Sequence, residues 1–522
     1  MEEIPSPTIE KTLIESQPRR VWRVEEKLFA WLLLPFGFLF WCVFPMSRKP
    51  LGAVLLLGAL YVCSGILLRK APAPRTALQK LVLLAAVFAA LGAVSWSNAF
   101  LSFFCVVYLL IAYAYLVYAR GGNCAGNGWN DGIGHDLFSA LVIFPFSSLG
   151  ALFGALKPKE GSSAAKSALK ILLGLMIAVL PTILVISLLS YDSGFYRILS
   201  GLFSLNGEKL TENLLRLLFG IPVALYVFAL YASSLSGRAA RAQQSERSKP
   251  VPLLTALFAA LPLLVVYGIF FVSQWRYYTG AFTGTLPVGL SYADYARDGF
   301  FELCTVACVN YVVVLCLNGL VRDEHPWVLR ALCLLYALFT LVLVATAVAK
   351  LLLYIRVYDL TPDRVYAAWF MLLLSFLFVI QLLRAFSVRI AALPLSFAVT
   401  TALFLLLVLS GPNRWIAAYN VNSYLTGRTA SVDLYTLEDL GDDAVGPMLR
   451  LEAAMREKNG GVRPKVEADR WGDYDYNSYE RLLLILEEKA REERPFFSKT
   501  VSGVWASKAL ECAHFGPAAE EG

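Results

Sequence analysis

Charged residues are scarce in this chain. Asp, Glu, Lys and Arg make up only 16% of its 522 residues, whereas hydrophobic residues make up 58%. Soluble domains carry about 25% charged residues, and the mean hydropathy of +0.60 is also far too high for them. The shortage of charge therefore excludes an ordinary soluble protein.

The sequence also lacks the residue patterns of common cofactor and metal sites. It has only three histidines and no H-E-x-x-H motif, and it has no Gly-Lys pair of the kind that a P-loop needs. Its nine cysteines are an odd number, and seven of them lie inside apolar runs, where a thiol behaves as a small hydrophobic group. We therefore expect no metal, no cofactor and no disulfide framework.

Long apolar runs dominate the chain instead. A helix needs about 20 mostly apolar residues to cross about 30 Å of hydrocarbon, and eleven runs are of roughly this length. They lie at residues 28–44, 51–68, 78–95, 99–118, 168–190, 214–235, 252–274, 300–321, 327–353, 366–384 and 390–409. The chain is therefore predicted to be an all-α, polytopic transmembrane helical bundle in contact with the lipid bilayer.

A further apolar run, at residues 137–156, contains Pro145 and is ambiguous. Loops on the cytoplasmic side carry an excess of Lys and Arg. If this run lies at the membrane interface or is re-entrant, the basic N-terminus and the 69–80, 157–170 and 236–250 loops all face the cytoplasm. If it spans the membrane, every later loop changes sides. We adopt the interfacial arrangement, which places the N-terminus inside and the C-terminus outside.

This topology divides the chain into three parts. Residues 1–27 form a polar cytoplasmic N-terminus, residues 28–410 form the transmembrane domain, and residues 411–522 are predicted to form a small helical soluble domain outside the membrane. Asn477, with Glu480 three residues later, predicts the start of a helix in that last part. The basic excess lies in loops between spans, where topology explains it, so we expect no nucleic-acid partner.

Three charged, tyrosine-rich stretches near span ends contain the candidate functional residues, and in this topology all three lie on the outer face. The stretches cover residues 291–302, 354–366 and 413–424. An interfacial helix with an aromatic belt would also explain the first, and Thr361–Pro362 in the second is an ordinary helix start. The candidates are Asp294, Arg297, Asp298, Glu302, Arg356, Asp359, Arg364 and Arg414.

The same stretches carry a family resemblance. YADYARDGFFEL, YIRVYDLTPDRVYA and RWIAAYNVNSYLTG, with the later VDLYTLEDLGDDAV, resemble the signatures of a family of uncharacterised bacterial multi-spanning membrane proteins, defined by a domain of unknown function. The resemblance covers about residues 120–455. It implies a bacterial plasma membrane and brings no activity, substrate or catalytic residue with it.

The centres of the predicted spans contain no Asp, Glu, Lys, Arg or His; Asn310, Asn318 and Gln381 are the amide-bearing exceptions. Ion-coupled carriers usually place an ionisable residue there. We therefore hypothesise a non-enzymatic envelope sensor, scaffold or assembly factor that acts on a membrane or envelope protein through its outer loops and residues 411–522. The alternatives are a transporter of an uncharged or lipid-like solute and an intramembrane enzyme.

Overall fold

The computed structural model confirms an all-α bundle. It describes residues 22–44, 49–71, 74–124, 129–156, 207–236, 251–273, 300–322, 325–387, 389–464 and 478–515. Within these ranges, ten helices are long and apolar enough to cross a membrane. They are α1 (Val24–Val43), α2 (Pro50–Leu67), α3 (Ala77–Ser95), α4 (Ala99–Arg120), α10 (Gly207–Ser234), α12 (Leu253–Ser273), α15 (Phe300–Leu320), α16 (Pro326–Tyr358), α17 (Pro362–Phe386) and α18 (Ala392–Ser410).

Ten of the eleven predicted spans thus correspond to a helix, and the run at 168–190 lies outside the described residues. The first helix begins before residue 28, the predicted boundary. It begins at Val24 because the Glu26 carboxylate accepts a hydrogen bond from the Arg23 N–H at 2.9 Å, which satisfies a donor at the helix start.

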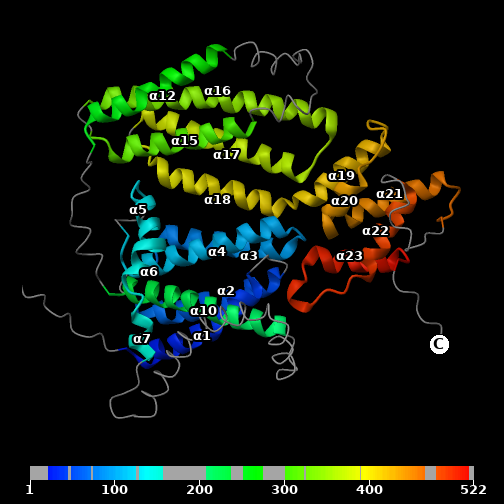
Figure 1. Cartoon of the computed structure of the whole chain (residues 1–522), viewed down its shortest axis with the longest axis horizontal. Coiled ribbons are helices and arrows are strands. Elements are labelled where there is room, and N and C mark those ends of the chain that lie inside the picture. Colours follow the sequence, from blue (N-terminus) through cyan, green and yellow to red (C-terminus); the bar gives the residue numbers. More distant parts are fainter. Residues whose placement is uncertain are drawn as a thin grey trace, which may run out of the picture.

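The long helices lie side by side in two groups (Figure 1). The first group contains α1–α4 and α10, and the second contains α12 and α15–α18. The groups meet where α3 packs against α18. This contact is close, because a Cβ added to Gly92 would lie 2.2 Å from the Cγ1 atom of Val408.

Helices α1 and α10 cross within the first group at two glycines. A Cβ added to Gly37 would lie 2.0 Å from the Gly220 carbonyl oxygen, and one added to Gly220 would lie 2.6 Å from the Gly37 carbonyl carbon. Small residues let membrane helices approach closely and gain van der Waals contact. The aromatic side chains of Phe29, Phe228 and Tyr231 then pack between the same two helices.

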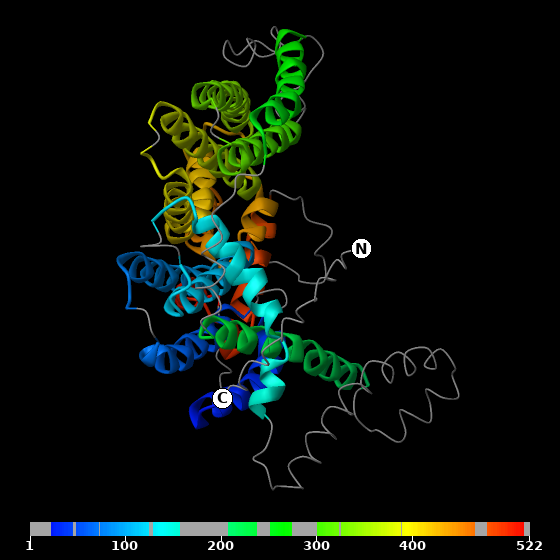
Figure 2. The same cartoon turned by 90° about the vertical axis from the view of Figure 1, so that its left-hand side faces the viewer.

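The ambiguous run forms one helix over Ile133–Ser147, shorter than a membrane span, and then a short helix. The first helix consists of α5 (Ile133–Phe138), a π-helical turn (Ser139–Ile143) and α6 (Phe144–Ser147), and the short one is α7 (Ala151–Leu156). Figures 1 and 2 show these segments running across one end of the long helices. Segment α5 contacts α18, whereas α6 and α7 contact α10 and α1, so this run touches both groups.

Within the described residues, seven short helical segments follow α18 at the opposite end (Figure 1). They are α19 (Pro412–Leu425), α20 (Leu434–Asp439), the 3-10 turn η3 (Gly441–Ala444), α21 (Val445–Lys458), α22 (Tyr479–Arg491), the 3-10 turn η5 (Phe496–Ser498) and α23 (Val501–Cys512). We call them the C-terminal helices. The prediction for α22 was wrong by one residue, because Ser478, and not Asn477, caps it by accepting the Arg481 N–H.

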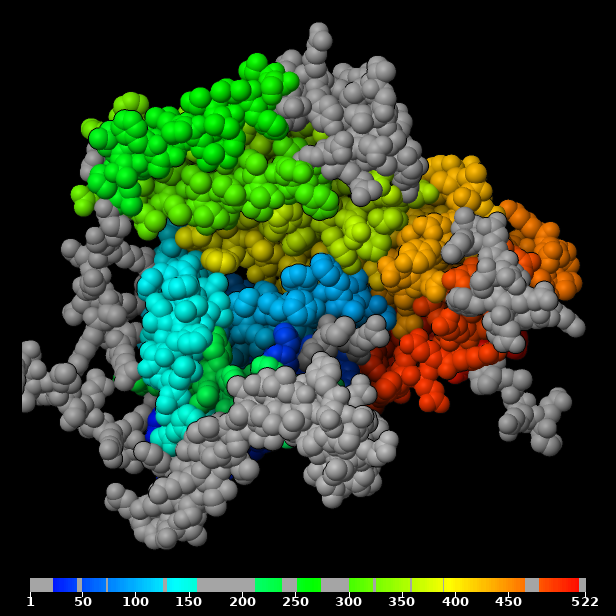
Figure 3. All heavy atoms as spheres, viewed as in Figure 1, coloured from blue at the N-terminus to red at the C-terminus, as the bar shows by residue number. Residues whose placement is uncertain are grey.

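The C-terminal helices have their own core and touch both groups of spans. Leucines of α20, α21 and α22 are buried together, and Glu452 accepts hydrogen bonds from Arg463 at 2.9 Å and Tyr479 at 3.0 Å. Helix α19 packs against α17 of the second group, while η5 and α23 pack against α2 and α3 of the first. Figure 3 shows this unit filling one end of the molecule.

Candidate functional site

A polar cavity lies between the C-terminal helices and the loops of the first group, and we call it the junction cavity. Its volume is about 570 Å³. The membrane-side wall includes Lys49, Trp96 and Ser102, and the opposite wall includes Lys489 and Glu493. Both signs of charge therefore face the same space, which suits a polar ligand better than an apolar one.

Two buried polar atoms in this wall have no hydrogen-bond partner in the described part of the chain. They are the indole Nε1 of Trp96 and the hydroxyl oxygen of Ser102. A buried donor or acceptor without a partner costs about 1–3 kcal/mol, and such groups in a cavity are commonly satisfied by a bound molecule. Both residues line the cavity, so an unused N–H donor and an unused hydroxyl lie in its wall.

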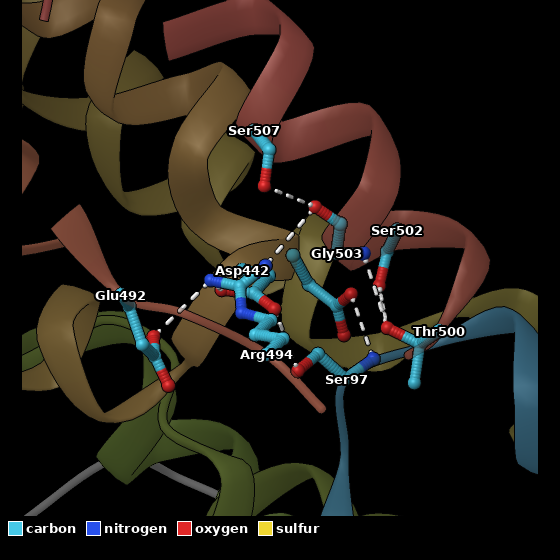
Figure 4. Close-up of polar contacts among 9 residues, drawn as sticks. Ser97, Asp442, Glu492, Arg494, Thr500, Ser502, Gly503 and Ser507 are labelled. Carbon is cyan, nitrogen blue, oxygen red and sulfur yellow. Dashed lines mark hydrogen bonds and ion pairs between the residues drawn. The ribbon is translucent and has the colours of Figure 1, made fainter. Parts of the chain in front are cut away.

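An ion pair within the C-terminal helices lines the cavity, and Ser97 of the membrane-side wall binds to it (Figure 4). Arg494 donates to the Asp442 carboxylate at 2.6 Å, to the Glu492 carboxylate at 3.1 Å and to the Gly503 carbonyl at 3.0 Å. The other oxygen of Asp442 accepts the Ser97 hydroxyl at 3.1 Å. The pair is largely buried, since the Arg494 and Asp442 side chains are 13% and 8% exposed.

The neighbouring carboxylate, Asp443, is in a different environment. Its side chain accepts the backbone N–H of Ser97 at 3.0 Å, and the residue is only 4% exposed. Burial raises the pKa of Asp443 above its ordinary value, and the adjacent Asp442 carboxylate adds to the rise, while hydrogen bonds and the Arg414 charge oppose it. Asp442 is therefore the carboxylate that pairs with an arginine, and Asp443 is the carboxylate whose charged form burial disfavours.

Asn98 joins three helices beneath the same cavity. Its side-chain oxygen accepts the Leu101 N–H at 2.9 Å and caps α4. Its amide nitrogen donates to the Tyr366 hydroxyl at 2.7 Å and to the Asn413 side-chain oxygen at 2.9 Å. Asn413 in turn donates to the Leu440 carbonyl at 3.1 Å. Every polar atom of Asn98 is used, so this network fixes α4, α17 and the C-terminal helices relative to one another.

Gly411 provides the sharp connection between α18 and α19. Its φ of 63° lies in the left-handed region, and an added Cβ would lie 2.6 Å from the Trp96 ring. Glycine is the residue that adopts this conformation without steric cost. Because Pro412 starts the next helix immediately, a single residue links the bundle to the C-terminal helices.

A second polar cluster surrounds the corner between α16 and α17. Asp359 has a φ of 60° and a ψ of −167°, a region that is almost restricted to glycine. Its carboxylate accepts Arg428 at 3.1 Å, and its backbone carbonyl accepts Arg364. Asn420 binds both the N–H and the carbonyl of Leu360, at 3.2 and 2.8 Å, and so holds the strained corner in place.

This corner opens into a second cavity, of about 400 Å³. The Arg428 guanidinium contacts the Tyr419 hydroxyl and lies 4.6 Å from the centre of that ring. The pKa of Arg428 is raised by its hydrogen bonds to Tyr419 and Asp359. The arginine therefore stays charged beside the cavity at any physiological pH.

The predicted candidates divide between these places. Asp294, Arg297 and Asp298 lie outside the described residues. Glu302 is exposed in the first turn of α15, and Arg356 is exposed near the end of α16. The structure therefore shows no shared contact for these two.

The remaining three candidates are better placed. Asp359 and Arg364 meet in the corner cluster, and Thr361 and Pro362 start α17 as predicted. Arg414 lies apart from them in α19, where its guanidinium carbon is 5.8 Å from the Trp505 ring. The second and third stretches thus meet at one end of the bundle, beside the C-terminal helices.

The sequence reasoning missed the residues of the junction cavity. Ser97 and Asp442 are 345 positions apart in the chain, and a lone serine after an apolar run carries no signal. The adjacent acids Asp442 and Asp443 after Gly441 were the available signal, because two carboxylates beside a turn need cationic or N–H partners.

Residues 83–451 match the sequence model of a protein family, DUF4153, described as a domain of unknown function. The chain belongs to the DUF4153 family. No curated protein matches it, and no solved structure does. The DUF4153 match begins earlier than the expected residue 120 and ends close to the expected residue 455.

The DUF4153 region includes part of each wall of the junction cavity and the whole corner cluster. Asn98, Asp359 and Asp442 lie within it, whereas Arg494 lies beyond its end at residue 451. Within the described residues, no three His, Cys, Asp or Glu side chains are grouped to hold a metal ion. The arrangement suits binding of a polar segment by hydrogen bonds and charge.

Proposed function

We propose that this DUF4153 protein is a non-enzymatic sensor or scaffold of a bacterial plasma membrane, and that a polar segment of an envelope protein binds in the junction cavity. The proposal rests mainly on the unpartnered Trp96 Nε1 and Ser102 hydroxyl in the cavity wall. A peptide supplies carbonyl acceptors and N–H donors for both atoms, and side chains of either charge for Lys489 and Glu493.

The position of the cavity supports a sensing role. The C-terminal helices contact α17 of one group of spans and α2 and α3 of the other. A ligand that separates or tightens the two walls would therefore bear on both groups at once. The C-terminal helices would act outside the membrane, and the N-terminus inside, as the distribution of basic loops favours.

The side chain of Asn310 favours this proposal over transport. Asn310, a buried amide in α15, accepts the Tyr267 hydroxyl and donates to Thr340, both at 2.8 Å. These contacts join α12, α15 and α16. An amide that is satisfied by its own helices is a packing residue, and it offers little to a solute on its way through the membrane.

Site-specific photocrosslinking in native membranes tests the binding role. A photoreactive residue at Glu493, which is exposed and lines the cavity, should capture one envelope protein. The same residue at Glu457, exposed on α21 away from the cavity, is the matched control. The double variant Trp96→Phe and Ser102→Ala removes the two unused polar atoms and should lower the yield at Glu493 about tenfold, for a loss of about 1.4 kcal/mol.

Uptake by the purified protein in liposomes tests the alternative. Flux of an uncharged solute or lipid that disappears in the Trp96→Phe and Ser102→Ala double variant would replace the proposal with transport. Equal crosslinking from Glu493 and Glu457 would also contradict a specific site in the cavity.

A further inference from the structure

A third cavity, which is apolar, lies at the other end of the first group, away from the C-terminal helices. It is formed by α2, α3, α4 and the 3-10 turn η1 (Leu68–Lys70), and its volume is about 340 Å³. Leu83, Leu84 and Val87 of α3 line it and are 37%, 51% and 49% exposed. The cavity is therefore a groove open along the outer face of α3.

Basic side chains surround one end of this groove. Arg75, Lys80 and Arg120 line it, and none of its described lining residues is acidic. Arg75 precedes α3, Lys80 lies in its first turn, and Arg120 is the last residue of α4. The three cations thus lie at the ends of spans, at the level where lipid headgroups meet the protein, while the leucines extend toward the hydrocarbon.

Gln79 supplies an independent indication of a ligand. The residue is 5% exposed, it lines the groove, and its side-chain oxygen has no hydrogen-bond partner among the residues that the structure describes. The other polar side chains of the groove floor are satisfied, since the Ser64 and Tyr113 hydroxyls are 2.7 Å apart and Tyr61 donates to the Leu109 carbonyl at 2.6 Å. The Gln79 side-chain oxygen can therefore accept a hydrogen bond from a ligand in the groove.

We propose that this groove binds an anionic glycerophospholipid whose headgroup carries a hydroxyl, with the phosphate between Arg75, Lys80 and Arg120 and the hydroxyl donating to Gln79. An acyl chain then follows Leu83, Leu84 and Val87 along α3. Basic pockets between membrane helices select anionic headgroups by charge, and an apolar groove below them distinguishes a lipid from a soluble phosphate.

Native mass spectrometry of the full chain in detergent tests this site with phosphatidylglycerol and phosphatidylcholine as probes. The wild-type protein should retain more phosphatidylglycerol than phosphatidylcholine. The variant Arg75→Gln/Lys80→Gln should weaken retention on the order of 10-fold to 30-fold. The control Arg330→Gln/Arg389→Gln removes two exposed cations at the same end of the bundle, outside the groove, and should retain the lipid.

A steric pair of variants tests the apolar part without changing charge. A Cβ added to Gly65 or to Gly58, both in α2, meets no atom within 4 Å, and only Gly65 lines the groove. Gly65→Leu should therefore fold normally and lose the lipid, whereas Gly58→Leu should keep it. Melting temperatures of both variants report folding independently.

Three results would overturn the proposal. They are equal retention of the two lipids by the wild type, undiminished retention of phosphatidylglycerol by Arg75→Gln/Lys80→Gln or Gly65→Leu, and competition by soluble glycerol phosphate as strong as by the lipid. The last result would assign the cations to a free phosphate.

Discussion

Two carboxylate–arginine pairs at the same end of this bundle are built from the same chemistry and differ in environment. Asp442 and Arg494 are 8% and 13% exposed at the junction, whereas Asp359 and Arg428 are 23% and 51% exposed at the corner. A buried pair becomes costly when one partner is removed, while an exposed pair contributes little. We infer that the Asp442–Arg494 pair stabilises the fold of the C-terminal helices. The Asp359–Arg428 pair contributes little and depends on the surrounding fold for its geometry.

The two aspartates also differ in backbone conformation. Asp442 lies in the 3-10 turn η3 of the C-terminal helices, whereas Asp359 has a positive φ in a region that glycine favours. Strain of this kind persists where the surroundings over-determine it and often accompanies function. Variants at the two pairs and at their neighbours test how far the pairs differ.

Arg494→Ala should have the largest effect because it leaves Asp442 buried without its cation. We expect a loss of about 3–5 kcal/mol in the stability of the C-terminal helices, measured by urea-dependent proteolysis of the full chain. Arg491→Ala is the control, since Arg491 pairs with Glu487 on the surface of α22 at 68% and 38% exposure. A similar loss of stability in both variants would show that the buried ion pair contributes no more than the exposed one.

Asn98→Ala should destabilise the junction by about 2–3 kcal/mol, because it removes the cap of α4 and both donors to α17 and α19. Proteolysis of the C-terminal helices is again the measurement. Asn422→Ala, which changes an exposed amide in α19, should alter the same rate little. An unaffected junction in Asn98→Ala would assign the docking to apolar packing alone.

Asp359→Gly and Asp359→Ala separate strain from pairing at the corner. Both remove the carboxylate that binds Arg428, but only glycine relieves the backbone. We expect the glycine variant to be more stable than the alanine variant by about 1 kcal/mol, measured as the difference in free energy of unfolding. Equal stabilities would mean that the positive φ of Asp359 stores no strain.

Asp443→Asn should have the smallest effect and should appear in the pH dependence. Because the pKa of Asp443 is raised above its ordinary value of 3.8, the folded chain keeps this proton at a pH where the unfolded chain has lost it. Stability is then greatest below the ordinary pKa and falls as the pH rises through the raised one. The asparagine variant should flatten this fall as the pH rises above the ordinary pKa of 3.8, measured by melting temperature.

Composition was enough to predict the spans, and it could not predict the junction. An apolar run of bilayer length has few alternatives to a helix, so ten runs correspond to helices within a few residues. The junction depends on Ser97, Asp442 and Arg494, which are polar residues in unrelated parts of the chain. The packing of the C-terminal helices on one another and on α3 brings them together, and pairings at long sequence separation leave no local pattern.

The corner cluster was half predictable for a similar reason. Asp359 and Arg364 stood out as charges next to a helix start, and they do meet. Arg428 and Tyr419 completed the cluster from α19 and the turn after it. The positive φ of Asp359 could not be read from the sequence, because aspartate itself gives no reason to expect a conformation that glycine prefers.

The crossing of Gly37 and Gly220 has a consequence for how the protein is made. The two glycines are 220 − 37 = 183 residues apart, so at about 5–20 residues per second the ribosome needs roughly 10–40 s to supply the second after the first. During that interval, α1 is in the membrane without the helix that packs most closely against it. Assembly of the first group therefore has to wait for α10, and a nascent chain halted after α4 would present an uncovered glycine face to whatever insertion machinery holds it.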